Sequence, residues 1–216
     1  MTRTQYHNDL DALKRNIIEM GEKSHRLIVD SVKALDSRDI ELAGNVVQRD
    51  KEIDDYDLKI ERFISQLIAR QSPTAGDMRL VTSCFKISLD LERMSDNAVD
   101  IAKGTRYLKE GYTRPPGNIL KMAELGQEML RQSMKAFDTL DEDLARATAR
   151  EDDKIDRLFY ETQKELIEMM SQDRSMINNA SYLLFVIRYL ERIGDHACNI
   201  CESVIYMASG ERVDLN

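Results

Sequence analysis

Residues 91–98, Leu-Glu-Arg-Met-Ser-Asp-Asn-Ala, reappear in the second half of the chain as residues 190–197, Leu-Glu-Arg-Ile-Gly-Asp-His-Ala. Each octapeptide carries a Glu-x-x-x-Asp motif, formed by Glu92 and Asp96 and again by Glu191 and Asp195. An Asp-x-x-x-Asp motif precedes each copy, at Asp50 and Asp54 in the first half and at Asp152 and Asp156 in the second. The same motifs in the same order indicate a duplicated supersecondary unit.

The composition favours helices in both halves. Of the 216 residues, 42% are hydrophobic and 32% are charged, whereas only 9 are Gly and 3 are Pro. Apolar residues recur at helical spacing, as in Leu10, Leu13, Ile17 and Met20. This pattern is interrupted at residues 36–38, 71–74, 111–117, 138–141 and 171–173, and the breaks delimit six helices. We therefore expect an all-α protein.

Three helices precede and three follow the segment Pro115-Pro116-Gly117, the only convincing hinge in the sequence. The chain is therefore predicted to form two tandem three-helix bundles related by internal duplication, at residues 1–112 and 117–216. Ser72, Asp39 and Asp141 stand at breaks where a side chain can cap the following helix.

Charge and hydropathy restrict the class of protein. No apolar stretch approaches the ~20 residues needed to span a bilayer, and the charged start does not resemble a signal peptide, so a soluble cytoplasmic protein is expected. A net charge of −8 argues against a nucleic-acid surface and favours cations or a basic partner. The Cys-x-x-Cys formed by Cys198 and Cys201 lies in a helical apolar pattern, which favours packing over metal or redox chemistry.

The acidic motifs carry the chemistry of this sequence. Residues four apart lie on one helix face, about 6 Å apart along the axis, so both members of each motif point the same way. If the second and third helices of each half are neighbours, four carboxylates converge in one groove per half. Such oxygen-rich ligation suits divalent or trivalent metals, with more than one ion where carboxylates bridge. Asp100 and Asn199 extend the third-helix rows by one turn and are further candidate ligands.

The simpler alternative is that acidic pairs on long helices only face water. One pair would favour that interpretation, but four pairs at equivalent places favour metal binding. Arg93 and Arg192 follow the key glutamates, where they can form edge ion pairs or orient a carboxylate. His196 is adjacent to Asp195, but its counterpart in the first half is Asn97, which weighs against a role as ligand.

With both octapeptides and the acidic pairs in view, the chain resembles the PhoU family of phosphate-signalling regulators over nearly its whole length. The resemblance implies two similar three-helix bundles that bind metal clusters of the iron or zinc type. The positions that match the family's metal motifs are Asp50, Asp54, Glu92, Asp96, Asp152, Asp156, Glu191 and Asp195.

The resemblance also implies a non-enzymatic negative regulator of phosphate uptake and starvation signalling. Its expected partners are the ATPase subunit of a phosphate ABC transporter and a sensor histidine kinase, so it would meet the membrane only through them. A homo-oligomer, in the first place a dimer, is expected from exposed apolar residues on long helices.

Two other functions stay open at this point. A carboxylate-bridged di-metal oxidoreductase would need Glu-x-x-His motifs on two helices, and only Glu22 and His25 have that spacing. A metal-free helical scaffold would be indifferent to chelators. The first half has Met94-Ser95 where the second has Ile193-Gly194, and the extra side chain predicts that the two sites are not equivalent.

Overall fold

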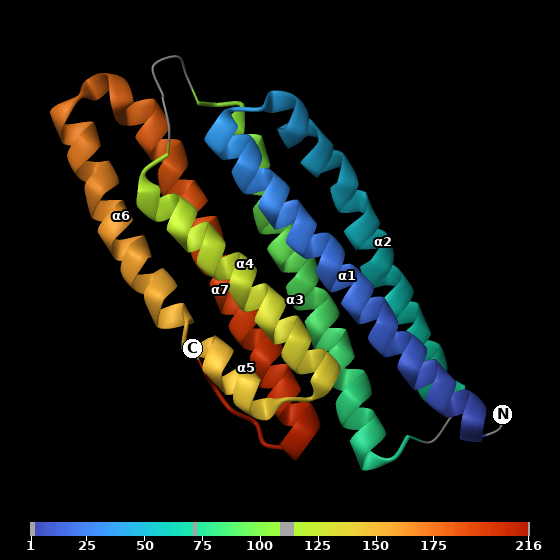
Figure 1. The fold of residues 1–216 in the computed structure, drawn as a ribbon. Coiled ribbons are helices and arrows are strands. Elements are labelled where there is room, and N and C mark those ends of the chain that lie inside the picture. Colours follow the sequence, from blue (N-terminus) through green and yellow to red (C-terminus); the bar gives the residue numbers. More distant parts are fainter. Residues whose placement is uncertain (1–2, 71–72, 109–114, 216) are drawn as a thin grey trace.

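The computed structural model describes residues 3–70, 73–108 and 115–215, and all the elements in these ranges are helical (Figure 1). The first half contains α1 (Arg3–Ser37), α2 (Ile40–Arg70) and α3 (Ala75–Thr105). The second half contains α4 (Gly117–Thr139), α5 (Glu142–Ala149), α6 (Asp152–Gln172), the short 3-10 helix η1 (Arg174–Met176) and α7 (Ile177–Ser209). The predicted all-α architecture of two related three-helix units is confirmed.

The second helix of the second half is divided. Where α2 is continuous over Ile40–Arg70, its counterpart is interrupted at Arg150 and Glu151, between α5 and α6. As a result Asp152 is the first residue of α6, whereas Asp50 lies well inside α2. The domain limits 1–112 and 117–216 remain a prediction, because residues 109–114 lie outside the described ranges.

The turns that open the second helix of each half are alike. Arg38 and Leu140 have positive φ angles of 56° and 54°, and an aspartate follows each of them. Asp39 Oδ1 accepts a hydrogen bond from Leu42 N, and Asp141 Oδ1 accepts one from Leu144 N, both at 2.9 Å. These caps satisfy helix N–H groups that would otherwise lack a partner. Ser72 lies outside the described residues, and Thr74 caps α3 in a capping box with Asp77.

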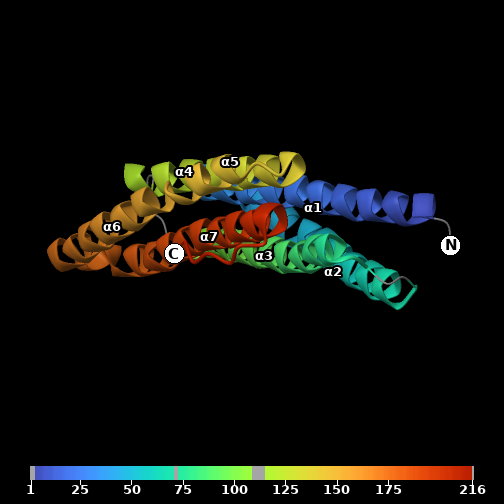
Figure 2. The ribbon, with the colours of Figure 1, turned by 90° about the horizontal axis from the view of Figure 1, so that it is seen from below.

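The helices form two layers (Figure 2). One layer contains α2, α3, α7 and α6 in that order, and α1, α4 and α5 cover it. The third helices of the two halves, α3 and α7, lie side by side at the centre, where Leu91 and Ile193 of the two octapeptides are fully buried. One continuous apolar core therefore joins both halves.

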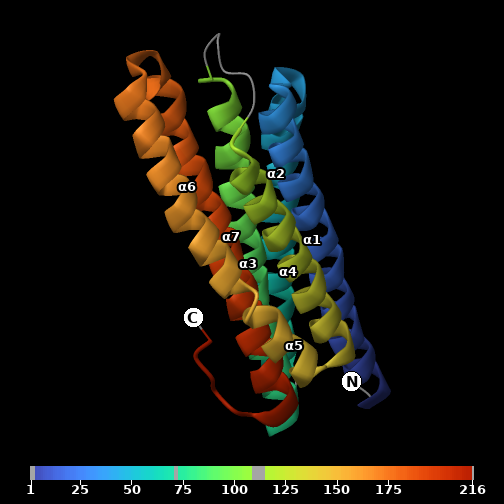
Figure 3. The same ribbon diagram turned by 60° about the vertical axis from the view of Figure 1, so that its left-hand side comes forward.

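The chain after α7 turns back along that helix (Figure 3). Gly210 begins the turn with a φ of 80°, a conformation that costs a glycine little because it has no Cβ. None of the described helices is long and apolar enough to cross a membrane.

Candidate metal centre

Four predicted carboxylates of the first half gather between α2 and α3. Burial, and after it the charges of Asp54, Asp96 and Asp100, raise the pKa of Asp50 to about 6. The pKa of Asp54 is raised by burial and by Asp96, and the pKa of Glu92 by burial and by Asp96. The charge of Asp96 on α3 therefore acts on both aspartates of α2. We call Asp50, Asp54, Glu92 and Asp96 the first cluster.

The second half brings the equivalent residues together between α6 and α7. Burial, and after it the charges of Asp195, Asp156 and Glu191, raise the pKa of Asp152 to about 7. The pKa values of Glu191 and Asp195 are also raised, first by burial and then by neighbouring carboxylates. Asp152, Asp156, Glu191 and Asp195 form the second cluster. The predicted convergence of the second and third helices is thus present in both halves.

Several carboxylate oxygens in these clusters are buried without a hydrogen-bond donor. They are Glu92 Oε2 in the first cluster and Asp152 Oδ1 and Glu191 Oε2 in the second. Glu92 Oε2 lies 3.4 Å from Arg93 Nε, an ion-pair distance without hydrogen-bond geometry. Burying a carboxylate oxygen without a partner is costly, and a cation is the partner that would offset both this cost and the mutual repulsion. The donor set, all hard oxygen, fits the metal that the sequence predicts.

In each half the carboxylates form rows along two helices, and they do not form a complete coordination shell. Within the described part of the chain, no three His, Cys, Asp or Glu side chains are already arranged around a single metal position. Glu92 and Asp96 lie on the flank of α3 that also carries Phe85 and Leu89, each more than one third exposed. The first cluster is therefore open to solvent along this flank.

The two octapeptides differ where the sequence predicted a difference. A Cβ on Gly194 would lie 2.4 Å from Asp152 Oδ1 and 2.9 Å from Ile155 Cδ1, so only glycine allows the start of α6 to approach α7 this closely. Ser95 at the equivalent position is buried, and its hydroxyl donates to the Leu91 carbonyl at 2.9 Å. Asp152 is 9% exposed as a result of the close approach, whereas Asp50 is only partly buried.

A model of the PhoU domain matches the chain twice, over residues 17–105 and again over residues 119–204. The chain belongs to the PhoU family. The two matched segments contain the two clusters, one in each.

Curated relatives agree with this assignment. A phosphate-specific transport system accessory protein PhoU homolog from Clostridium acetobutylicum is 38% identical and covers 100% of each chain. A homolog of the same name from Streptococcus pneumoniae serotype 4 is 34% identical over 99% of this chain and 100% of its own.

Two crystal structures match the fold. The phosphate transport system regulatory protein PhoU from Streptococcus pneumoniae aligns with a TM-score of 0.92 at 32% identity, covering 97% of this chain and 99% of that chain. PhoU from Pseudomonas aeruginosa aligns with a TM-score of 0.90 at 31% identity, covering 95% and 100%.

One acidic residue of this PhoU-family chain was missed at the sequence level. Asp57 Oδ1 is buried without a hydrogen-bond partner, and the charge of Asp57 raises the pKa values of Glu92 and Asp54. Asp57 follows Asp50 by seven positions and so lies on the same face of α2. That spacing was the available signal, but the corresponding position of the second half is Phe159, so the duplication did not reveal it.

The two proposed additional ligands are placed differently. Asp100 adds its charge to the environment of Asp50, and it also forms an ion pair with Lys103 at 3.1 Å. Asn199 instead faces the other half, because its Nδ2 donates to Asp90 Oδ1 at 3.1 Å. His196 Nδ1 lies 3.0 Å from the same oxygen. Asp90 thus joins α3 to α7 directly beside the second cluster, a contact between halves that no local motif predicts.

The arginines of this PhoU-family chain also divide their roles. Arg93 is exposed, and its guanidinium lies 3.4 Å from Glu92 and 3.9 Å from Asp96. Of the two predicted roles, an ion pair at the bundle edge or the orientation of a carboxylate, this geometry is that of the edge ion pair. In the second half, Arg188 forms the ion pair with Glu191, and Arg192 acts on Glu191 and Asp195 only through its charge. Arg188 precedes Glu191 by three positions, a spacing that the sequence comparison did not use.

The Glu-x-x-His motif lies apart from the clusters, whereas of the three cysteines Cys198 is close enough to the second cluster for Asp152 and Asp195 to raise its pKa, after burial. Cys84, Cys198 and Cys201 are free and buried, and burial raises the pKa of Cys84 and of Cys201 to about 12, so all three serve packing. His25 lies with Glu22 in a groove between α1 and α4, where burial and Arg131 lower its pKa. Neither residue acts on a cluster carboxylate.

Proposed function

We propose that this chain is a metal-binding regulator of phosphate uptake and phosphate-starvation signalling. The observation that carries the proposal is the pair of equivalent carboxylate clusters, each with raised pKa values and buried unpartnered oxygens, in a chain of the PhoU family. Relatives that match its whole length are named accessory proteins of the phosphate-specific transport system. These names support a regulatory function and not an enzymatic one.

Each cluster would hold metal ions of the iron or zinc type, with carboxylates able to bridge two ions. Bound cations would offset the negative charge of the four carboxylates and link the second helix of each half to the third. Helices linked in this way would give the layer of α2, α3, α7 and α6 a defined surface for a partner. The side chains that would hold the ions are the eight cluster residues, with Asp57 and Asp100 as further ligands in the first half.

The proposed partners are the ATPase subunit of a phosphate ABC transporter and a sensor histidine kinase. Self-association as a dimer is also proposed, and Phe85 and Phe185, which are 38% and 58% exposed, are apolar residues available to such contacts. Through these partners the chain would lower phosphate uptake and starvation signalling when phosphate is plentiful.

The test is co-purification with the tagged transporter ATPase from cells grown in high and in low phosphate. We expect association in high phosphate, and we expect it to be lost in a variant with both clusters neutralised (Asp50→Asn, Glu92→Gln, Asp152→Asn and Glu191→Gln). The control carries Glu165→Gln and Glu168→Gln, which remove two exposed charges of α6 outside the clusters. The absence of association at every phosphate concentration would contradict the proposal.

The same preparations test the two alternatives. A di-metal oxidoreductase would consume oxygen with bound iron, although its only Glu-x-x-His pair lies in the α1–α4 groove. A metal-free scaffold would keep its stability and its partner binding after chelation. Either result would contradict the proposed metal-dependent regulator and favour the corresponding alternative.

A further inference from the structure

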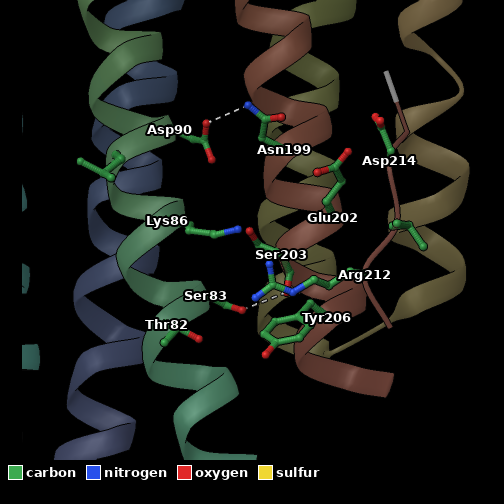
Figure 4. Close-up of a pocket in the computed structure, with 12 residues that line it drawn as sticks. Thr82, Ser83, Lys86, Asp90, Asn199, Glu202, Ser203, Tyr206, Arg212 and Asp214 are labelled. Atoms are coloured by element: carbon green, nitrogen blue, oxygen red, sulfur yellow. Dashed lines mark hydrogen bonds between the residues drawn. The ribbon is translucent and has the colours of Figure 1, made fainter. Parts of the chain in front are cut away.

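A cavity of about 630 Å³ lies between α3, α7 and the C-terminal residues, and none of the eight cluster residues lines it (Figure 4). Its floor is formed by one face of α3, from Thr82 to Asp90, and one face of α7, from Asn199 to Tyr206. Its third wall is formed by Arg212, Val213 and Asp214. The volume is in the range of small-molecule sites in proteins, about 300–1,000 Å³.

The third wall is held in place by specific contacts. Leu215 N donates to Glu202 Oε1 at 2.9 Å, and Glu211 forms an ion pair with Arg146 of α5 at 2.9 Å. The guanidinium of Arg212 lies over the ring of Tyr206, 5.1 Å from its centroid. Residues 210–215 are therefore fixed along α7 at both ends, and the cavity that they close is part of the fold.

The two ends of the cavity have opposite chemistry. Figure 4 shows Lys86 and Arg212 near one end, and Asp90, Asn199, Glu202 and Asp214 toward the other. Among the described residues, neither Lys86 nor Arg212 forms an ion pair with a carboxylate, although Asp90, Glu202 and Asp214 line the same cavity. At the acidic end, Asp90 accepts from Asn199 and Glu202 accepts from the Leu215 amide.

We propose that this cavity binds a small hydroxylated organic anion. Its oxyanion would lie between Lys86 and Arg212, where charge-assisted hydrogen bonds are the strongest available contacts. Its hydroxyl groups would donate toward Asp214 and Glu202, whose carboxylates only accept. The carbon skeleton would rest on Leu89, Tyr206 and Val213. A phosphate ester and a carboxylate share this chemistry.

The experiment is a calorimetric titration of the full-length chain with four probes that separate the two ends. Glucose 6-phosphate and gluconate carry both an oxyanion and hydroxyl groups, glucose lacks the oxyanion, and inorganic phosphate lacks the hydroxyl groups. We expect saturable binding of one or both of the first two probes, with glucose and inorganic phosphate at least about tenfold weaker. Comparison of glucose 6-phosphate with gluconate tells which oxyanion is preferred.

Three variants locate the binding. Lys86→Met and Arg212→Gln should each weaken the bound probe about tenfold or more, and Lys164→Met, an exposed lysine of α6, should leave it within twofold. The titration is repeated after dialysis against a chelator, and the effects of Lys86→Met and Arg212→Gln should persist, because neither side chain belongs to a cluster. The proposal is overturned if neither anion binds, if inorganic phosphate or glucose binds as well as the anion, or if the two variants change nothing.

Discussion

The two clusters are copies of one arrangement, yet they differ in how closely their helices approach. In the second cluster the absence of a side chain at Gly194 lets Asp152 pack against α7, and the pKa of Asp152 rises to about 7. In the first cluster Ser95 is present, Asp54 is exposed, and the pKa of Asp50 rises only to about 6. The first cluster instead has a fifth acidic residue, Asp57. Duplication thus kept the ligand pattern while burial and charge diverged.

The largest expected effect is that of metal removal on stability, and its dependence on pH. A carboxyl whose pKa is higher in the folded than in the unfolded state binds more protons when the chain is folded. Its contribution to the free energy of unfolding is therefore full below about pH 4 and is lost as pH rises. For the metal-free protein, the free energy of unfolding should fall as pH rises through about 6 at Asp50 and about 7 at Asp152. Metal at about 100 times its Kd should restore about 3 kcal/mol at pH 7.5.

Urea unfolding of chelator-treated protein between pH 4.5 and 8 measures this. Asp152→Asn should reduce the pH-dependent decrease in the free energy of unfolding more than Asp50→Asn does. A free energy of unfolding that is constant or rises over this range would contradict the electrostatic account of the clusters.

The next largest effect is expected when the difference between the octapeptides is erased. Gly194→Ser should destabilise the fold by about 1–3 kcal/mol and weaken metal binding in the second half, because the new Cβ meets Asp152. The matched change Ser95→Gly should cost about 1 kcal/mol of helix stability and leave metal binding in the first half unchanged. Equal effects of the two substitutions on metal binding would show that the close approach of α6 is not what distinguishes the sites.

A smaller effect is expected from the extra carboxylate. Asp57→Asn should weaken metal binding at the first cluster about tenfold and leave the second cluster unaffected, because Phe159 occupies the corresponding position. Glu61→Gln, an exposed charge on the same helix, is the control. Competition titration with a metal indicator, carried out with the second cluster neutralised, isolates the first. An unchanged affinity would exclude Asp57 from the site.

The smallest effect concerns the contact between the halves. Asp90→Asn should lower the free energy of unfolding by about 1 kcal/mol, because Asp90 Oδ1 lies within hydrogen-bond distance of both His196 and Asn199. Glu165→Gln should change it much less. Urea unfolding of both variants is the measurement, and equal values for the two would mean that this contact does not stabilise the α3–α7 junction.

Composition and helical periodicity were sufficient to predict the helical class, and the repeated motifs predicted the duplication. The convergence of the cluster residues needed the further assumption that the second and third helices of each half are neighbours, because spacing along one helix places only the two members of each motif on one face. Asp57 was missed because it has no counterpart to mark it. The pairing of His196 with Asp90 depends on how α3 meets α7, and the third wall of the cavity depends on residues 210–215 turning back. Such contacts between distant segments are set by tertiary packing, which no local pattern encodes.

The most direct test of the central claim is metal content measured separately for each half. The chain, incubated with iron or with zinc and then freed of excess metal, is compared with Asp50→Asn/Glu92→Gln, with Asp152→Asn/Glu191→Gln and with the Glu165→Gln/Glu168→Gln control by elemental mass spectrometry. Two metal-binding clusters predict that each cluster variant loses the metal of its own half only and that the control loses none. Unchanged metal content in both cluster variants, or no metal bound to the unaltered chain, would contradict the account.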